Sequence, residues 1–457
     1  MSGTTNLFVD VPPEDPRKLS PEARRRHFKE IYARFTAEEA RRQASRCAQC
    51  GVPYCQHGCP LQNNIPDWLR LTAEGDFHTA WVLASQTNTL PEICGRICPQ
   101  DRLCEGACTL EASGWRHVTI GAVERFLGDL AWEEGWILPV EAQARTGQSV
   151  GVIGGGPAGL AAVDRLLHAG YDVVVYDRHD KAGGLLTYGI PSFKLEKDVI
   201  GRRVERLAQS GARFVLNAEV GTAPAFADLQ ARHDALLIAT GVYRARQLEL
   251  PGSELGGIAP ALDFLIAANR QNLGYTLDAA TLALRTATDR DVVVIGGGDT
   301  AMDCVRTAVR QKARSVTCLY RKQRADMPGS AREIAHAEEE GVRFLWRSQP
   351  TRYLGAGGRI AAVEVAGADA PLKADLVIEA IGFEAEDLPV LFGQPELKIR
   401  RNGTLDVAPG TGRTSLPGVF AAGDIVRGAS LAVWAVRQGQ DAAAAIHAYL
   451  SRMRQAA

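Results

Sequence analysis

The sequence predicts an α/β protein in which an N-terminal helical domain precedes two domains built on parallel sheets. Three observations support this fold class. Eight of the ten cysteines fall in two groups before residue 110. An apolar strand, a glycine-rich turn and a helix follow at 149–167, and the same pattern returns at 291–309. Strands that alternate with helices are typical of parallel sheets covered by helices.

The chain of 457 residues is long enough for about three domains. Its 46% apolar and 23% charged residues are typical of a folded globular protein. A formal net charge of −1 gives no reason to expect nucleic acid or an anionic membrane as a partner. No apolar run approaches the roughly 20 residues that span a bilayer, and the N-terminus lacks a secretory signal. We therefore expect a cytoplasmic protein, in which clustered cysteines indicate metal or redox centres rather than disulfides.

The first predicted element is the segment Pro21–Ser45, which is rich in Arg, Glu and Ala. Phe28, Ile31 and Phe35 recur in it at helical spacing. This pattern predicts a largely solvated helical arm with a narrow packed face.

The two cysteine groups come next, and each contains one Cys-Pro pair. They read Cys47-x2-Cys50-x4-Cys55-x3-Cys59-Pro60 and Cys94-x3-Cys98-Pro99-x4-Cys104-x3-Cys108. The spacing admits two structural zinc sites or two 4Fe–4S clusters. The x4 gap differs from the x2 gap of bacterial ferredoxins. A flavin domain directly downstream, as argued below, favours clusters, because zinc does no redox work whereas iron–sulfur clusters accept single electrons.

In two-cluster ferredoxins the last cysteine of one group binds the other cluster. The same sharing predicts that Cys108 joins the first three cysteines of the N-terminal group. The first ligand set is then Cys47, Cys50, Cys55 and Cys108, and the second contains Cys59, Cys98 and Cys104. The fourth ligand of the second set is either Cys94 or Glu124, which lies on a helix-like stretch at 119–124.

The stretch 149–159 reads SVGVIGGGPAG and predicts a dinucleotide-binding turn. Gly154 permits the tight turn, Gly156 lets a pyrophosphate approach the backbone, and Gly159 lets the helix pack on the strand. Pro157 and Ala158 open that helix, whose N-terminus faces the phosphates. The next strand, 173–176, ends on Asp177, whose carboxylate can bind ribose hydroxyls.

The stretch 291–301 reads DVVVIGGGDTA and predicts a second dinucleotide site. Its turn contains Gly296 and Gly298, with Ala301 in the third position, and Asp299 and Thr300 begin the helix. The following strand, 315–320, ends on cations instead of an acid, namely Arg321, Lys322 and Arg324. Because this change is typical of a site for a 2′-phosphate, we expect NADPH here and FAD at the first turn.

Three later stretches belong to the predicted FAD domain. AGGLLTYGIP at 182–191 is a glycine-rich loop near a ligand, and the neighbouring Lys194 faces either the flavin or solvent. ALLIATG at 235–241 is a buried strand that ends in a turn at Gly241, and ADLVIEAIG at 374–382 repeats it where the chain returns. GVFAAGD at 418–424 presents Gly423 and Asp424. A helix from about Gln438, with Gly439 at its start, is expected to direct its N-terminus at the flavin ring.

The cysteine groups, the segment IGAVE at 120–124 and the turn at 149–159 together resemble the small (beta) subunits of bacterial NADPH-dependent glutamate synthases. They are also similar to the N-terminal half of dihydropyrimidine dehydrogenase. The resemblance covers nearly the whole chain. It implies that Gly184 and Leu185 pack around FAD and that Asp424 accepts a hydrogen bond from the ribityl chain. It favours Glu124 over Cys94, because the matching positions of the dehydrogenase are a glutamine ligand and a cysteine that is not a ligand.

The resemblance also implies a function. The chain would oxidise NADPH at FAD and pass electrons through two 4Fe–4S clusters to a large (alpha) subunit, which makes glutamate from glutamine and 2-oxoglutarate, within a higher-order hetero-oligomer. The cofactors carry the chemistry, so we expect no catalytic nucleophile or base. Two alternatives stay open from the residues: an NADPH-dependent flavin and iron–sulfur oxidoreductase that feeds ferredoxin or a different reductase subunit, and a zinc-stabilised nucleotide-binding adaptor.

The complete prediction is an N-terminal helical iron–sulfur domain followed by two Rossmann-like dinucleotide-binding domains, with the NADPH domain inserted in the FAD domain. The predicted boundaries are 1–147 for the helical domain, 148–257 and 381–457 for the two parts of the FAD domain, and 258–380 for the NADPH domain.

Overall fold

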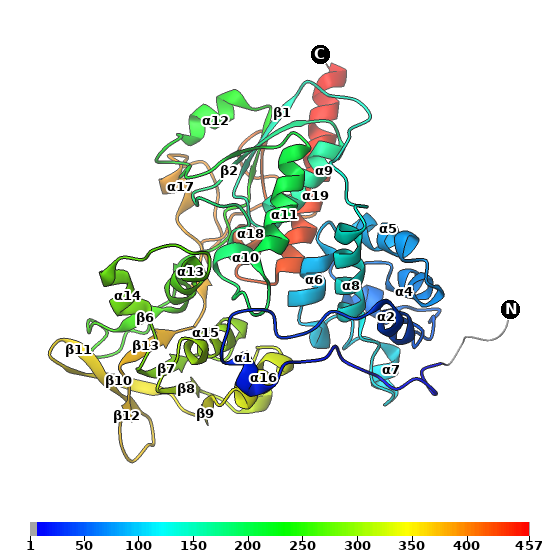
Figure 1. Cartoon of the computed structure of the whole chain (residues 1–457). Coiled ribbons are helices and arrows are strands. Elements are labelled where there is room, and N and C mark those ends of the chain that lie inside the picture. The colour runs from blue at the N-terminus through cyan, green and yellow to red at the C-terminus, as the bar shows by residue number, and fades with distance from the viewer. Residues whose placement is uncertain (1–6, 457) are drawn as a thin grey trace.

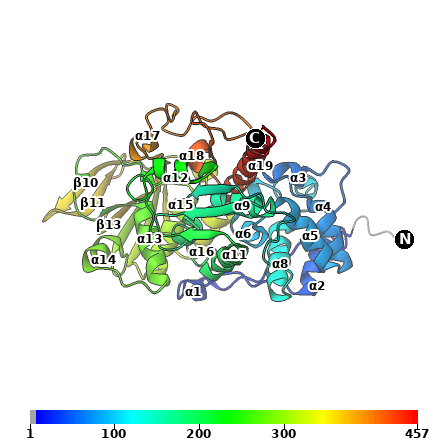
Figure 2. The same cartoon turned by 90° about the horizontal axis from the view of Figure 1, so that it is seen from above.

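The computed structural model describes residues 7–456, which form three lobes (Figure 1). N-terminal helices form one lobe, and each of the other two is built around a five-stranded parallel sheet. From above, the N-terminal helices lie at the opposite end of the molecule from a small antiparallel sheet (Figure 2). The predicted α/β fold class is therefore confirmed.

The N-terminal lobe packs short helices around a common core in which Trp68, Leu69 and Phe126 are buried. Its helices leave loops between them, and the cysteines of the two groups lie on these loops and at helix ends, except Cys94, which lies in the middle of a helix. The helices are α2 (Ala37–Ala44), α3 (Tyr54–Gly58), α4 (Ile65–Glu74), α5 (Phe77–Thr87), α6 (Pro91–Ile97), α7 (Thr109–Ala112) and α8 (Ile120–Glu133), with a 3-10 turn at Gln100–Arg102.

The first sheet has the strand order β15-β4-β1-β2-β3. Its strands are β1 (Ser149–Ile153), β2 (Asp172–Tyr176), β3 (Arg213–Val215), β4 (Ala235–Ile238) and β15 (Val419–Ala421). The helices of this lobe are α9 (Pro157–His168), α10 (Leu185–Tyr188), α11 (Lys197–Gln209), α12 (Phe226–Arg232), α18 (Asp424–Arg427) and α19 (Ala432–Ala456). The apolar faces of α9 and α19 pack on the sheet in one core cluster.

The second sheet repeats this design with the strand order β6-β13-β7-β8-β9. Its strands are β6 (Ile258–Pro260), β7 (Asp291–Ile295), β8 (Ser315–Tyr320), β9 (Arg343–Trp346) and β13 (Leu376–Glu379). The helices are α13 (Ala261–Asn272), α14 (Ala279–Arg285), α15 (Asp299–Arg310) and α16 (Ala331–Glu339), with a 3-10 turn at Arg324–Asp326.

The chain leaves the first sheet after β4 and returns to it only with β15, so the second sheet lobe is inserted in the first. The two segments that connect the sheet lobes are joined by hydrogen bonds, because β5 (Arg244–Ala245) pairs with β14 (Phe383–Glu384). The antiparallel sheet of β10 (Pro350–Ala356), β11 (Arg359–Val365) and β12 (Leu372–Lys373) extends from the inserted lobe, and α17 (Leu388–Leu391) follows the return crossing.

The expectation of a continuous helical arm at 21–45 is wrong. Only α1 (Pro21–Arg24) and α2 are helical there, and residues 17–33 form a strap that lies beside α16 of the inserted lobe (Figure 1). Leu19 N donates to Ile31 O across the strap at 3.0 Å. Arg24 is fully buried instead of solvated, because its guanidinium forms ion pairs with Glu339 and Glu340 at the end of α16.

Glu340 is the centre of a buried charge cluster. Arg306 and Arg310 of α15 each place two nitrogens within 3.1 Å of its carboxylate. Burial alone would raise the pKa of Glu340, but hydrogen bonds from these two arginines hold it at about 2. The Phe193 ring of the first sheet lobe lies 4.5 Å and 3.9 Å from the same two guanidiniums. The cluster therefore joins the strap and both sheet lobes.

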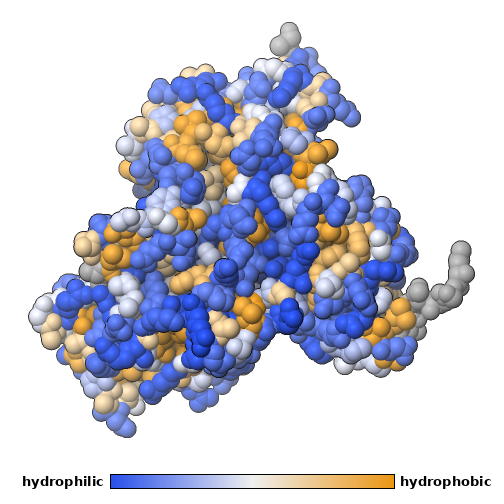
Figure 3. Space-filling view, viewed as in Figure 1, coloured by the Kyte–Doolittle hydropathy of each residue, from blue (hydrophilic) through white to orange (hydrophobic). Residues whose placement is uncertain are grey.

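The molecular face in Figure 3 is mostly hydrophilic, with separate hydrophobic patches. Among the helices of residues 7–456, none combines the length and the apolar character that crossing a bilayer requires.

Candidate functional site

A large cavity lies between the two sheet lobes and reaches the N-terminal lobe. It encloses about 1990 Å³ of space, part of it open to solvent. The predicted residues that line it are Gly154, Gly156, Pro157, Ala158, Asp177, Gly184, Leu185, Gly241, Asp299, Thr300, Gly423 and Asp424.

The first glycine turn has the geometry that its predicted role requires. Gly154 has φ +107°, and a Cβ on Gly159 would lie 2.0 Å from the Gly154 carbonyl oxygen. A Cβ on Gly156 would find only the Gly184 Cα, at 3.9 Å, so this position is a cradle open to the cavity. The Asp177 carboxylate accepts from the Gly155 amide at 2.7 Å, which fixes it beside the turn. These features fit a bound dinucleotide.

Three residues beside Asp177 were missed by the sequence reasoning. The Arg178 guanidinium lies 4.3 Å from the Tyr243 ring centroid, and the His179 ring lies 5.9 Å from the same ring. All three side chains line the cavity. His179 Nε2 is buried and makes no hydrogen bond within residues 7–456, so it is an orphaned polar atom at a ligand site. The only signal in the sequence was that Arg178 and His179 directly follow Asp177.

The last helix differs from the expectation in one respect. α19 begins at Ala432 instead of near Gln438, so Gly439 lies inside the helix and does not start it. No helix-breaking residue stands between these positions, and the glycine has a packing role: a Cβ on Gly439 would lie 2.1 Å from the Ala158 carbonyl oxygen. Ala432 and Val433 line the cavity, so the helix N-terminus still faces it.

Two carboxyl groups that line the cavity have raised pKa values. Burial raises the pKa of Asp424 to about 6, although the Ser430 hydroxyl donates to it at 2.9 Å. Burial also raises the pKa of Asp303 to about 6, against the attraction of the Lys194 ammonium 2.9 Å away. Lys194 therefore lines the cavity and forms an ion pair with a residue of the other sheet lobe. Of the two orientations expected for it, the one toward bulk solvent is wrong.

The second glycine turn lies at the carboxyl end of β7. A Cβ on Gly296 would lie 2.3 Å from the Ala380 carbonyl oxygen, whereas a Cβ on Gly298 would meet no atom within 4 Å. Ala301 is fully buried under the helix start. The turn thus has one glycine for backbone packing and one that leaves room for a phosphate.

The cations predicted to bind a 2′-phosphate lie on an exposed turn after β8. Arg324 forms a bidentate ion pair with Glu338, with both N–O distances 3.0 Å. The side chains of Arg321 and Lys322 are exposed and make no hydrogen bond or ion pair with any residue in the range 7–456. They are free for a ligand, while Arg324 already has a partner.

The cysteines gather in the two sets that the sharing rule predicted. Cys47, Cys50, Cys55 and Cys108 line one cavity. Cys59, Cys98, Cys104, Cys94 and Glu124 line another. None of these thiols forms a disulfide. Burial raises the pKa of Cys55 and of Cys59 to about 12, so the bare thiols are neutral and would lose this penalty by binding iron.

Both candidates for the fourth ligand face the second cysteine cavity. Asn88 Nδ2 donates to Glu124 Oε1 at 2.9 Å, and Cys94 Sγ donates to Asn88 Oδ1 at 3.7 Å. Within residues 7–456, no three His, Cys, Asp or Glu side chains are arranged so that they could hold a single metal ion. The donor set of thiols around two cavities fits iron–sulfur clusters, and the choice between Glu124 and Cys94 stays a prediction.

Two family models match the chain. Residues 24–136 match the family described as dihydropyrimidine dehydrogenase domain II, 4Fe-4S cluster. Residues 148–439 match the pyridine nucleotide-disulphide oxidoreductase family. The matches agree with the division into a cysteine-containing helical lobe and two nucleotide-binding lobes, and the first favours iron–sulfur clusters over zinc.

Curated relatives match along almost the full chain. The glutamate synthase NADPH small chain of Azospirillum brasilense is 54% identical over 97% of this chain and 95% of its own length. The corresponding small chain of Escherichia coli (strain K12) is 42% identical over 98% of this chain and 100% of its own length.

Among solved structures, Mycobacterium tuberculosis FprA in complex with NADPH superposes with a TM-score of 0.53 at 18% identity. The match covers 68% of this chain and 86% of that chain. At this identity the similarity concerns the fold alone.

Proposed function

The chain belongs to the family of NADPH-dependent glutamate synthase small chains, and from this premise we propose that it oxidises NADPH and passes the electrons to a large chain that makes glutamate from glutamine and 2-oxoglutarate. Within the proposal, the first turn binds FAD, the second binds NADPH, and the two cysteine sets hold one 4Fe–4S cluster each. When bound, FAD accepts a hydride from NADPH, and the clusters carry its electrons onward one at a time.

One continuous arrangement carries the proposal. Cys98 and Val433 line both the cofactor cavity and the cavity of the second cysteine set. The first set lies farther out, where Val52 and Tyr54 are more than half exposed. These contacts support an electron path from the cofactor cavity to the second set, then to the first set and the surface.

The proposed roles of the protein side chains are positional. Asp299 and Thr300 begin α15 at the cavity, where the helix N-terminus favours a pyrophosphate. The N-terminus of α19 lies at the cavity, where its partial positive charge would favour an anionic reduced flavin. Arg102 of the N-terminal lobe pairs with Asp299 at 3.1 Å, so the cysteine lobe is docked onto the proposed NADPH site.

The partners and the location are proposed on the basis of the family. We propose a large glutamate synthase subunit as the electron acceptor, a higher-order hetero-oligomer and a cytoplasmic location. The chain alone would oxidise NADPH without making glutamate, because the proposal assigns glutamine and 2-oxoglutarate to the large subunit.

The first experiment measures iron, zinc and flavin in anaerobically purified protein, and records the visible spectrum before and after NADPH. We expect about eight iron atoms and one FAD per chain, with bleaching by NADPH. Adding the purified large subunit, glutamine and 2-oxoglutarate should then give NADPH-dependent glutamate formation, which the chain alone should not show.

Each result has a distinct meaning. Zinc without flavin would contradict the redox proposal. Bleaching by NADPH without glutamate formation would retain the oxidoreductase and favour a different electron acceptor. A second comparison separates the two fourth-ligand candidates: Glu124→Ala should lower the iron content to about four atoms, whereas Cys94→Ala should leave about eight.

A further inference from the structure

A second cavity lies between the strap, the N-terminal lobe and α16, on the far side of the wall that carries Lys194 and Glu333. It encloses about 1050 Å³ of space, part of it open to solvent. Arg96, Lys194, Arg332 and Glu333 line both this cavity and the cofactor cavity. The FAD and NADPH sites proposed above are assigned to the cofactor cavity and not to this one.

Almost every charge on the lining of the second cavity has a partner. Glu30 pairs with Arg96 at 2.7 Å and with Arg125 at 2.8 Å. Lys194 pairs with Asp303, and Glu333 pairs with Arg306 at 2.5 Å. The other paired charges are Asp15 with Arg116, Lys18 with Glu339 and Glu105 with His117. These pairs cancel, so they leave little net charge in the cavity.

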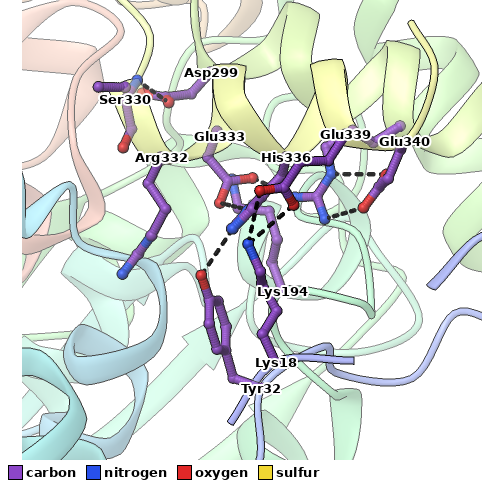
Figure 4. Close-up of polar contacts among 12 residues, drawn as sticks. Lys18, Tyr32, Lys194, Asp299, Ser330, Arg332, Glu333, His336, Glu339 and Glu340 are labelled. Atoms are coloured by element: carbon purple, nitrogen blue, oxygen red, sulfur yellow. Dashed lines mark hydrogen bonds and ion pairs between the residues drawn. The ribbon is translucent and has the colours of Figure 1, made fainter. Parts of the chain in front are cut away.

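Arg332 is the exception. Within residues 7–456 its guanidinium has no ion pair, and its one hydrogen bond runs from Nη2 to the neutral Gln100 Oε1 at 3.1 Å. Its Nε is buried and makes no hydrogen bond. Figure 4 shows Arg332 pointing away from the group formed by Glu333, His336 and Lys194. Arg332 thus has no direct ion pair in the described part of the chain. Burial lowers the pKa of its guanidinium, but the nearby carboxylates of Glu333, Glu105 and Asp101 raise it above the usual range.

Thr119 supplies a second, independent observation. It occupies the N-cap position of α8, where a threonine oxygen usually accepts from a backbone amide of the first turn. Here the Thr119 side chain makes no such bond, and Glu105 Oε1 accepts from the Gly121 amide instead. The residue is 3% exposed, and its Oγ1 makes no hydrogen bond within residues 7–456 although it lines the cavity.

The remaining lining gives the ligand its shape and polarity. Arg125 Nε is also buried without a hydrogen bond in the described part of the chain. Ile31, Phe193 and Ala335 provide apolar surface on the same lining. The cavity thus combines a guanidinium that has no ion pair among the described residues, two spare donors at Thr119 Oγ1 and Arg125 Nε, and apolar surface.

We propose that this cavity is a second ligand site, separate from the cofactor site, that binds a small aliphatic carboxylate of net charge −1. The carboxylate would pair with Arg332 and accept from the Thr119 hydroxyl. The site suits a monoanion better than a dianion, because a second negative charge would meet the carboxylates of Glu30 and Glu105. The ligand would contact the strap, the N-terminal lobe and α16 together.

The test is isothermal titration calorimetry of the cofactor-loaded protein, saturated with NADP⁺, against four probes: butyrate, L-glutamate, 2-oxoglutarate and inorganic phosphate. We expect butyrate or L-glutamate to bind with one site per chain, and more tightly than the two more highly charged probes. Arg332→Gln should weaken this binding at least tenfold, and Thr119→Val about fivefold. Arg343→Gln removes an exposed arginine outside the cavity and should leave the affinity unchanged.

Several results would overturn the proposal. One is the absence of binding by both monoanions up to about 10 mM. Others are equal affinities in Thr119→Val and the wild type, or tighter binding of the dianions. Probe binding that is seen only when the titration is repeated without NADP⁺ would assign Arg332 to the cofactor site instead. Thr119→Val keeps the test decisive if Arg332→Gln fails to fold, because it removes one hydroxyl and preserves the side-chain shape.

Discussion

Coenzyme selectivity should depend on Arg321 and Lys322 and much less on Arg324, although all three cations follow the same strand. Arg324 is held by Glu338 in two bonds of 3.0 Å, so it must break an ion pair before it can bind a phosphate. Within residues 7–456, no partner holds the side chains of Arg321 and Lys322. The perturbation is therefore Arg321→Ala and Lys322→Ala, singly and together, with Arg324→Ala as the matched control.

The magnitude follows from charge-assisted hydrogen bonds to phosphate. At an exposed site we take the lower end of their range, about 1.5 kcal/mol each. Each single substitution should then raise the KM for NADPH about tenfold, and the double substitution about 100-fold if the two effects add. The kcat should stay unchanged, because the 2′-phosphate is remote from the transferred hydride and contributes uniform binding.

The assay is steady-state reduction of ferricyanide by the purified chain with NADPH or NADH as donor. The KM for NADH should be the same in all variants, since NADH lacks the 2′-phosphate. Arg324→Ala should raise the KM for NADPH less than threefold. The reasoning is refuted if Arg324→Ala has the largest effect, or if the KM for NADH rises in parallel with that for NADPH, which would indicate a general loss of the site.

Three further outcomes are expected. Cys98→Ala should lower the iron content to about four atoms per chain and abolish electron transfer to the large subunit, while anaerobic spectra still show flavin bleaching by NADPH; retention of eight irons would contradict the second ligand set. Arg24→Met should speed hydrogen exchange at the Leu19 amide about 30-fold, because losing the buried ion pair lowers the free energy of opening the strap by about 2 kcal/mol while the other arginines still hold Glu340. The exposed Arg26→Met should leave this rate unchanged, and equal exchange rates in the two variants would exclude a strap held by Arg24. The pKa of Glu340 is about 2 in the folded protein and 4.5 ordinarily, so its contribution to stability is present above pH 4.5 and is lost as the pH falls toward 2. Between pH 6.0 and pH 3.5 the free energy of unfolding in urea should therefore fall by about 1.4 kcal/mol more in the wild type than in Glu340→Gln. Identical decreases would show that this carboxylate does not act as inferred.

The sequence alone was sufficient for the two glycine turns, the insertion of one sheet lobe in the other and the grouping of the cysteines. The turns and the cysteine groups are local patterns, and the insertion is indicated by the strand at 235–241 and its repeat at 374–382. Gly154 and Gly296 satisfy backbone geometry within their own turns, and the alternation of strands and helices determines a parallel sheet. Cys108 could be assigned to the first set because ligand sharing is a property of cysteine spacing.

Other features depend on residues that are distant in the chain, and only the tertiary structure decided them. Arg24 looked like a solvated residue because its partners Glu339 and Glu340 lie more than 300 positions away. Gly439 looked like a helix start because the sequence does not show that it packs against Ala158, about 280 residues away in the chain.

The same reason explains the cavities. Tyr243 lies in no motif, and Lys194 could not be oriented before Asp303 was brought beside it. Arg332 is distinctive only because every neighbouring charge is paired, and pairing is a property of three-dimensional contacts. Local patterns thus determined which chemistry the chain contains, whereas long-range packing and the resulting desolvation decided which charges are buried, which are paired and which remain free.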